Sequence, residues 1–102
     1  MTKWADYLVS AVRYEPGSNN RIITYFKVHE DIGNSIGESR TWTKDELLNE
    51  LIRGKTFATI LKDQNGKWIK GEEVTISSFK EIFVRSDFKN VPGDYLQNIA
   101  EF

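Results

Sequence analysis

The sequence contains no cysteine and only one histidine among its 102 residues. The absence of cysteine excludes disulfide frameworks, cysteine-ligated zinc or iron–sulfur sites and thiol nucleophiles. A single histidine also leaves a hydrolytic zinc site short of nitrogen ligands, because such sites usually take three protein ligands. We therefore expect a core that packing alone holds together, and no cofactor.

Long hydrophobic runs are missing as well. No stretch approaches the roughly 20 consecutive apolar residues that a helix needs to cross a bilayer. Asp6 also interrupts the N-terminal segment, where a secretory signal requires an uninterrupted apolar region. We expect a cytoplasmic protein that has no membrane partner.

The chain has almost no excess charge, with 14 Lys and Arg against 15 Asp and Glu. A domain that binds mainly to the phosphate backbone of nucleic acid is usually strongly basic. Any nucleic-acid site in this chain must therefore be a local patch of positive charge.

The residues that are present suit one small core. Hydrophobic residues make up 39% of the chain and aromatic residues 13%, and a chain of this size buries roughly 60 to 70% of the surface that its unfolded form exposes. No linker or repeat divides the sequence. We predict a single domain over residues 1–102, with a less regular C-terminal segment over residues 86–102 that packs at intervals across it.

Alternating apolar residues and turn signals predict a mostly β protein. Residues 5–14 and 21–30 read as two strands of a hairpin, because residues 15–20 favour a turn, and residues 38–41 read as a short further strand. Asn65-Gly66 predicts a second hairpin between residues 57–62 and 67–70, since both turn residues accept positive φ. We expect Gly71 to interrupt the outgoing strand. Further β segments are predicted at 73–77 and 80–85, and their candidate core residues are Val74, Ile76, Phe79, Ile82 and Val84.

One helix is well marked, from Lys44 to Arg53. Thr43 and Glu46 have the spacing of a capping box, and Trp42 and Leu47 that of a hydrophobic staple. Gly54 stands where a left-handed residue ends a helix. A helix of about three turns is not stable alone, so it must dock on the sheet. The predicted fold class is α+β, a mostly antiparallel sheet with one helix on one face.

Several separated blocks occur in an order that resembles a known family. They are Ser10-Ala11-Val12-Arg13-Tyr14, Val28-His29-Glu30-Asp31 with Gly33 and Gly37, Trp42-Thr43, Gly54-Lys55-Thr56-Phe57, Gly66-Lys67-Trp68-Ile69-Lys70-Gly71-Glu72 and Glu101-Phe102. Over almost its whole length the chain resembles the short bacterial proteins grouped as domain of unknown function 3892. It departs from their pattern near the end, where Ile99-Ala100 replace a Leu-Pro pair. The resemblance implies a single domain and brings no established activity and no catalytic residue.

The second hairpin gathers Lys62, Lys67, Trp68 and Lys70. An indole flanked by cations can stack a nucleic-acid base while the ammonium groups meet phosphate. Alternatively, Trp68 packs across the strand against Leu61 or Ile60, and the lysines discourage edge-to-edge association. The neighbouring acids Glu72 and Glu73 weaken the nucleic-acid hypothesis.

Four arginines form a second candidate group: Arg13, Arg21, Arg40 and Arg85. If they converge, their guanidinium groups can grip a carboxylate or phosphate. The alternative is ordinary pairing with surface acids.

The segment His29-Glu30-Asp31 is a weak candidate for a metal or acid–base site, against a simple strand end. The hydroxyls of Thr56, Thr59, Ser77 and Ser78 have no Ser-His-Asp pattern, nucleophile elbow or phosphate loop around them. An enzyme is therefore the least supported class.

We expect a small binding or protein-interaction module without catalysis, with a protein partner or a second copy as its ligand. Tyr, Trp and Arg are enriched at interface cores, and the residues available for such a surface are Tyr14, Arg13, Arg85, Tyr7, Trp4 and Trp68. One alternative is a nucleic-acid or nucleotide accessory protein that uses the hairpin Lys67-Trp68-Lys70. Another is a phage or host-defence regulator, which fits the size of the chain.

Overall fold

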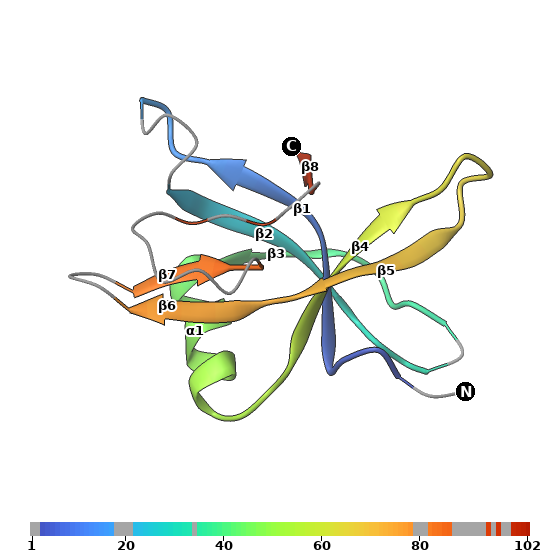
Figure 1. The fold of residues 1–102 in the computed structure, drawn as a ribbon, viewed down its shortest axis with the longest axis horizontal. Coiled ribbons are helices and arrows are strands. Elements are labelled where there is room, and N and C mark those ends of the chain that lie inside the picture. The colour runs from blue at the N-terminus through green and yellow to red at the C-terminus, as the bar shows by residue number, and fades with distance from the viewer. Residues whose placement is uncertain are drawn as a thin grey trace.

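One sheet of six strands organises the chain. In the computed structural model, the described residues are 3–17, 22–33, 35–78, 82–86, 94, 96 and 99–102. The elements are β1 (Tyr7–Tyr14), β2 (Ile23–Glu30), β3 (Arg40–Thr43), α1 (Lys44–Ile52), β4 (Phe57–Lys62), β5 (Trp68–Glu73), β6 (Thr75–Ser78), β7 (Ile82–Arg85) and β8 (Ala100–Glu101). The sheet has the order β3-β2-β1-β4-β5, with β8 also paired to β1 (Figure 1).

The sheet is mixed but mostly antiparallel. β1 pairs antiparallel with β2, and parallel with β4 and with β8. The β1–β4 pair is parallel because α1 carries the chain from β3, at one edge of the sheet, back to the other side of β1. The predicted small α+β domain with one short helix is confirmed.

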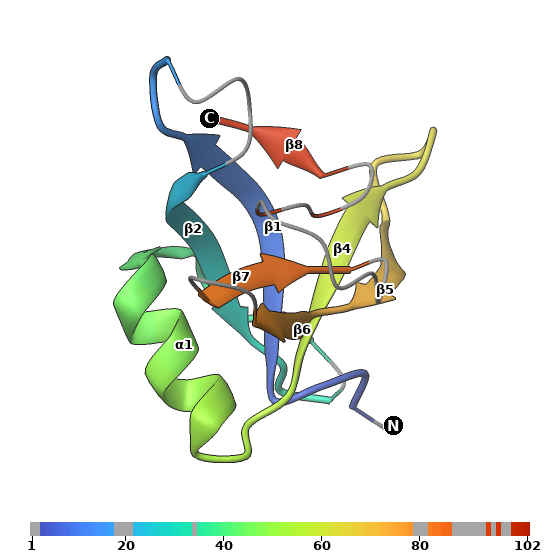
Figure 2. The same cartoon turned by 60° about the vertical axis from the view of Figure 1, so that its left-hand side comes forward.

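The main core lies between the sheet and the elements on one side of it. It joins Val9, Val12 and Phe26 of the sheet to Leu47 of α1 and Val84 of β7, all fully buried. Figure 2 shows α1 and the β6–β7 pair on this same side of the sheet. A smaller cluster of Leu8, Ala58 and Ile60 lies on the opposite face.

The helix is capped as its sequence predicts. The Thr43 hydroxyl accepts from the N–H of Glu46 at 3.2 Å, and the Thr43 N–H donates to the Glu46 carboxylate at 3.0 Å. Trp42 packs against the cluster that contains Leu47, in agreement with the predicted staple. At the other end Gly54 has φ +95°, its N–H donates to Leu51, and the N–H of Lys55 donates to Glu50. These two bonds form a Schellman motif, so the helix ends at Ile52 with Arg53 as its C-cap.

Both predicted hairpins are confirmed. β1 and β2 pair over their whole length, and β4 pairs with β5 around the Asn65-Gly66 turn. In that turn Gly66 has φ +77° and its N–H donates to the Asp63 carbonyl at 3.0 Å. The Asp63 carboxylate accepts from the N–H groups of Asn65 and Lys67, which fixes the turn from inside.

Gly71 does not interrupt its strand, contrary to the prediction. β5 runs through Gly71 to Glu73, and the irregularity is a bulge in its pairing with β4. The Thr59 hydroxyl occupies the space in which a Cβ on residue 71 would stand, and it accepts from the N–H of Glu72 at 2.8 Å. The glycine therefore provides room for a buried hydroxyl within a continuous strand.

Three further boundaries differ from the sequence prediction. The short strand before the helix is Arg40–Thr43, not residues 38–41. The C-terminal segment includes a short regular element, since Ala100–Glu101 pairs with β1. The segment predicted at 73–77 begins as β6 only at Thr75, because Glu73 belongs to β5.

Some predictions fall on positions that the structure does not describe. Arg21, Phe79, residues 18–20 of the first turn and residues 87–93, 95, 97 and 98 of the C-terminal segment lie outside the described residues. The same holds for the side chains of Ile76 and Ile82. Of the candidate core residues in this region, Val74 and Val84 are buried as predicted. None of the described helices is long and apolar enough to span a bilayer.

Candidate functional site

Three aromatic rings, one each from β1, β3 and β4, meet on the sheet face beside α1. The ring of Tyr7 lies edge-on to Trp42 with centroids 5.0 Å apart, and it stacks on Phe57 at 5.1 Å. Trp42 and Phe57 are also in edge contact at 5.8 Å. Phe57 is fully buried, whereas Tyr7 and Trp42 are half-buried. Two large rings are thus fixed from behind and remain open to solvent in front.

A pocket of about 370 Å³ opens on one side of these rings. Its walls are Tyr7, Val28, Glu30, Gly37, Glu38, Arg40 and Trp42. The register explains this set, because Tyr7 is opposite Glu30 and Val28 is opposite Arg40, so all four side chains share one face of the sheet.

A second pocket, of about 340 Å³, adjoins the first and shares Tyr7 and Trp42 with it. The helix supplies its other wall through Glu46, Asn49, Glu50 and Arg53. This spacing of three and four residues places the four side chains on one helix face. We call the two pockets together the Tyr7–Trp42 groove.

The rim of the Tyr7–Trp42 groove is mostly acidic. It carries the carboxylates of Glu30, Glu38, Glu46 and Glu50 against the guanidinium groups of Arg40 and Arg53. Glu50 and Arg53 pair at 3.3 Å, and one oxygen of Glu46 is held by the helix cap. Aromatic faces and carboxylates both attract cations, so the groove is suited to a positively charged ligand group.

The second hairpin places its tryptophan between a cation and the sheet. Lys62 Nζ lies 4.9 Å from the centroid of Trp68, and Trp68 packs against the cluster of Leu8, Ala58 and Ile60. Its ring also meets that of His29 at 5.8 Å. The packing alternative for Trp68 is thus present in the structure, and the ring is half-buried. Lys67 and Lys70 are exposed near it.

The described arginines occupy different places. Arg13 is exposed on β1, where its Nε donates to the Phe102 carbonyl at 3.0 Å. Arg40 lines the Tyr7–Trp42 groove, and Arg85 is 7% exposed on β7. Tyr14 is half-buried against the main core. Arg21 lies outside the described residues. Of the four candidate arginines only Arg40 is among the described residues that line the groove, so the expected convergence with Arg13 and Arg85 is not found there.

His29, Glu30 and Asp31 point to three different partners. His29 is buried, with Nε2 at 2.7 Å from the Ser10 hydroxyl and Nδ1 at 2.8 Å from the Gly37 carbonyl. The Asp31 carboxylate accepts from the N–H groups of Trp4, Ala5 and Gly33. Glu30 lies on the opposite face of the strand, in the Tyr7–Trp42 groove. Among the described residues no three such side chains gather as metal ligands.

Of the candidate hydroxyls, those of Thr56 and Thr59 have structural partners, and the side chains of Ser77 and Ser78 lie outside what the structure describes. Thr56 donates both its N–H and its hydroxyl to the Asp6 carboxylate, at 2.8 and 3.1 Å. These hydrogen bonds, with weaker attraction from Lys55 and Lys3, hold the pKa of Asp6 below its ordinary value. Thr59 is fully buried beside Gly71.

The sequence reasoning did not find most of the groove. It assigned Trp42 to the core and named Tyr7 only as one of several interface candidates, and it attached no role to Glu38 or Glu50. A signal was available in the sequence. Glu46, Asn49, Glu50 and Arg53 repeat at helical spacing on the polar face of a helix that begins directly after an aromatic residue.

The comparisons with known proteins give no further guide to this site. No family model, curated protein or solved structure matches the chain. The resemblance to domain of unknown function 3892 stays a prediction.

Proposed function

We propose that the protein is a binding module without catalysis, and that it takes a lysine- or arginine-containing segment of a partner protein in the Tyr7–Trp42 groove. The observation that carries this proposal is the shared aromatic wall of two adjoining pockets, with glutamates on both sides of it. Half-buried Tyr and Trp rings are typical anchors at protein interfaces.

The shape of the groove supports a segment more than a small molecule. Its two pockets together extend from the end of β2 to the helix face that carries Arg53. Cationic side chains at intervals along a partner segment can then occupy each pocket in turn. The rigid backing by Phe57 keeps the rings in place, so little side-chain entropy is lost on binding.

The direct test is a titration with short lysine- and arginine-rich peptides, followed by NMR. The chain has three tryptophans, so each indole N–H gives its own signal. We expect the Trp42 signal to shift with increasing peptide while that of Trp68 stays in place, and a glutamate-rich peptide to have no effect. No shift at Trp42, or an equal shift at Trp68, contradicts the proposal.

Charge variants of the groove make this test more specific, because removal of a carboxylate and removal of a guanidinium group should change the peptide affinity in opposite directions. The double change Glu38→Gln and Glu50→Gln should weaken peptide binding about twofold to 30-fold, since exposed charge pairs contribute about 0.2 to 1 kcal/mol each. Arg40→Gln should strengthen it, because it removes a like charge from the rim. Glu72→Gln, on the exposed β5, is the matched control and should change nothing.

A second copy of the chain is the alternative occupant of the groove. Sedimentation of the protein alone distinguishes the two cases. A concentration-dependent dimer that Glu38→Gln dissociates indicates self-association, whereas a monomer leaves the partner segment as the ligand. A strict monomer from which pull-downs recover no partner, together with no peptide binding, rules out the interaction module.

A further inference from the structure

The sheet face turned away from α1 and β7 carries a second set of exposed side chains. Residues that are partners across two strands share a face, which assigns the members of this face from the register. Arg13 is opposite Tyr25 and Ala11 is opposite Lys27, while Ile60 is opposite Lys70 and Lys62 is opposite Trp68. We call this surface the open face.

Positive charge is concentrated on the open face. Its cations are Arg13, Lys27, Lys62 and Lys70, and the carboxylate that the register places on it is Glu73, opposite Ala58. The chain as a whole carries 14 basic and 15 acidic residues. The two signs are thus separated in space, because the acidic Tyr7–Trp42 groove occupies the other face.

Aromatic rings lie among these cations. The charged groups of Arg13 and Lys27 lie 4.8 and 4.9 Å from the centroid of the Phe102 ring. Lys62 Nζ lies 4.9 Å from the centroid of the Trp68 ring. Tyr25 is 42% exposed beside Arg13. In single-stranded nucleic-acid sites, aromatic rings stack the bases and neighbouring positive groups contact the phosphates.

We propose that the open face binds single-stranded nucleic acid, independently of the groove. Bases stack on the exposed ring of Tyr25, and the charged groups of Arg13, Lys27, Lys62 and Lys70 meet the phosphates. A broad sheet surface suits unpaired bases better than a duplex, because duplex readers insert an element into a groove and single-strand readers offer stacking platforms. The carboxylates of an acidic peptide can pair with the cations, but they do not stack on the exposed ring of Tyr25.

The primary test is a fluorescence titration with oligo-dT and oligo-U of about 12 nucleotides, within the range that one small sheet domain covers. With about three phosphates neutralised, affinity should fall about 20-fold between about 50 and 200 mM salt. Equal binding of both strands supports a shared backbone site, and a preference for oligo-U supports the same face with an RNA ligand. Binding that is absent at low salt, or that does not depend on salt, overturns the proposal.

Two classes of variant separate stacking from charge. Lys62→Gln with Lys70→Gln should lower the slope of log affinity against log salt by about 1.4, that is about 0.7 for each lost phosphate contact. Tyr25→Leu should weaken binding about fivefold or more, whereas Tyr25→Phe keeps the ring and should retain binding. If Tyr25→Leu lowers the stability of the domain, Tyr25→Phe and the lysine variants still decide the question. If Tyr25→Leu and the lysine variants all bind oligonucleotide with unchanged affinity, the proposal is overturned.

Matched controls distinguish this site from the groove and from a general surface for anions. Arg53→Gln removes an exposed cation from the other side of the molecule and should leave oligonucleotide binding unchanged. Glu38→Gln, which should weaken peptide binding in the groove, should also leave oligonucleotide binding unchanged. A glutamate-rich peptide should bind much more weakly than the oligonucleotides. Equal binding of that peptide, or an equal loss with Arg53→Gln, overturns the proposal without affecting the proposed function of the groove.

Discussion

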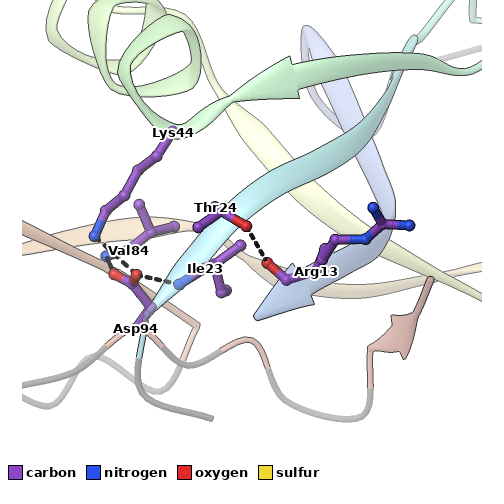
Figure 3. Close-up of polar contacts among 6 residues, drawn as sticks. All are labelled: Arg13, Ile23, Thr24, Lys44, Val84 and Asp94. Atoms are coloured by element: carbon purple, nitrogen blue, oxygen red, sulfur yellow. Dashed lines mark hydrogen bonds and ion pairs between the residues drawn. The ribbon is translucent and has the colours of Figure 1, made fainter. Parts of the chain in front are cut away.

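The buried carboxylate of Asp94 forms an ion pair with Lys44, the first residue of α1, at 2.8 Å. The same carboxylate accepts from the N–H of Ile23 at 2.7 Å and from the N–H of Val84 at 2.8 Å (Figure 3). One side chain thus ties the C-terminal segment to the start of β2, to β7 and to the helix. Nearby, the Thr24 hydroxyl donates to the Arg13 carbonyl and fastens the end of the first hairpin.

Removal of this carboxylate should destabilise the domain strongly. Asp94→Ala leaves two buried N–H groups without their acceptor and removes the ion pair with Lys44, and we expect a loss of about 3 to 5 kcal/mol in the free energy of unfolding. Urea denaturation of the purified variant measures this loss.

Lys44→Met is the matched comparison. It leaves both N–H groups satisfied, and the Lys44 side chain is 20% exposed, so the loss should be smaller, about 1 to 2 kcal/mol. Equal losses in the two variants would show that the ion pair, not the pair of backbone hydrogen bonds, dominates this contact.

The sequence predicted what depends on neighbouring residues and missed what depends on distant ones. The capping box of Thr43 and Glu46, the glycine end of the helix and the Asn65-Gly66 hairpin are short-range signals, and all are present. The contact of Asp94 with Ile23 joins residues 71 positions apart, and no local pattern marks it. The parallel pairing of β1 with β4 and β8 is likewise set by how the chain returns to the sheet.

The same distinction applies to the candidate site. The hydrophobic staple predicted that Trp42 packs beside the first turn of the helix, which holds for one side of its ring. That its other side lines a groove with Glu38 and Glu50 depends on how α1 is placed against β3, and sequence spacing does not fix that placement. Gly71 was misread for a related reason, since only its approach to Thr59 explains the glycine.

In its neutral form, the His29 ring should carry its proton on Nδ1. The Gly37 carbonyl can only accept a hydrogen bond, so Nδ1 must donate to it, and Nε2 then accepts from the Ser10 hydroxyl. Nitrogen NMR of the ring above neutral pH distinguishes the two tautomers. A proton found on Nε2 would contradict the arrangement, and Ser10→Ala should cost about 1 kcal/mol of stability by leaving Nε2 without its donor.

Gly71 and Thr59 should behave as a coupled pair. Gly71→Ala places a methyl group against the buried Thr59 hydroxyl and should destabilise the domain by about 1 to 3 kcal/mol. In a Thr59→Ala background the same change should cost less, because the clashing oxygen is gone. A double-mutant cycle in urea measures the coupling, and strictly additive losses would show that the two residues do not compete for the same space.

Asp6 should contribute to the stability of the domain above its ordinary pKa and lose that contribution in acid. Hydrogen bonds from the Thr56 N–H and hydroxyl lower the pKa of Asp6 below 3.8 in the folded state. The unfolded chain therefore takes up this proton first, and the stabilisation is present above about pH 4 and disappears as the pH falls through the folded pKa. The free energy of unfolding should thus fall more steeply below pH 4 in the wild type than in Asp6→Asn.

Thr56→Val tests the cause of this shift. The valine keeps the backbone N–H, which is the largest cause of the lowered pKa, and removes the hydroxyl, which is the second. Carbon NMR of the Asp6 carboxyl should therefore show a pKa that rises in the variant but stays below 3.8. A pKa at or above that value in the wild type would contradict the hydrogen bonds between Asp6 and Thr56. An unchanged pKa in the variant would assign the whole effect to the backbone N–H.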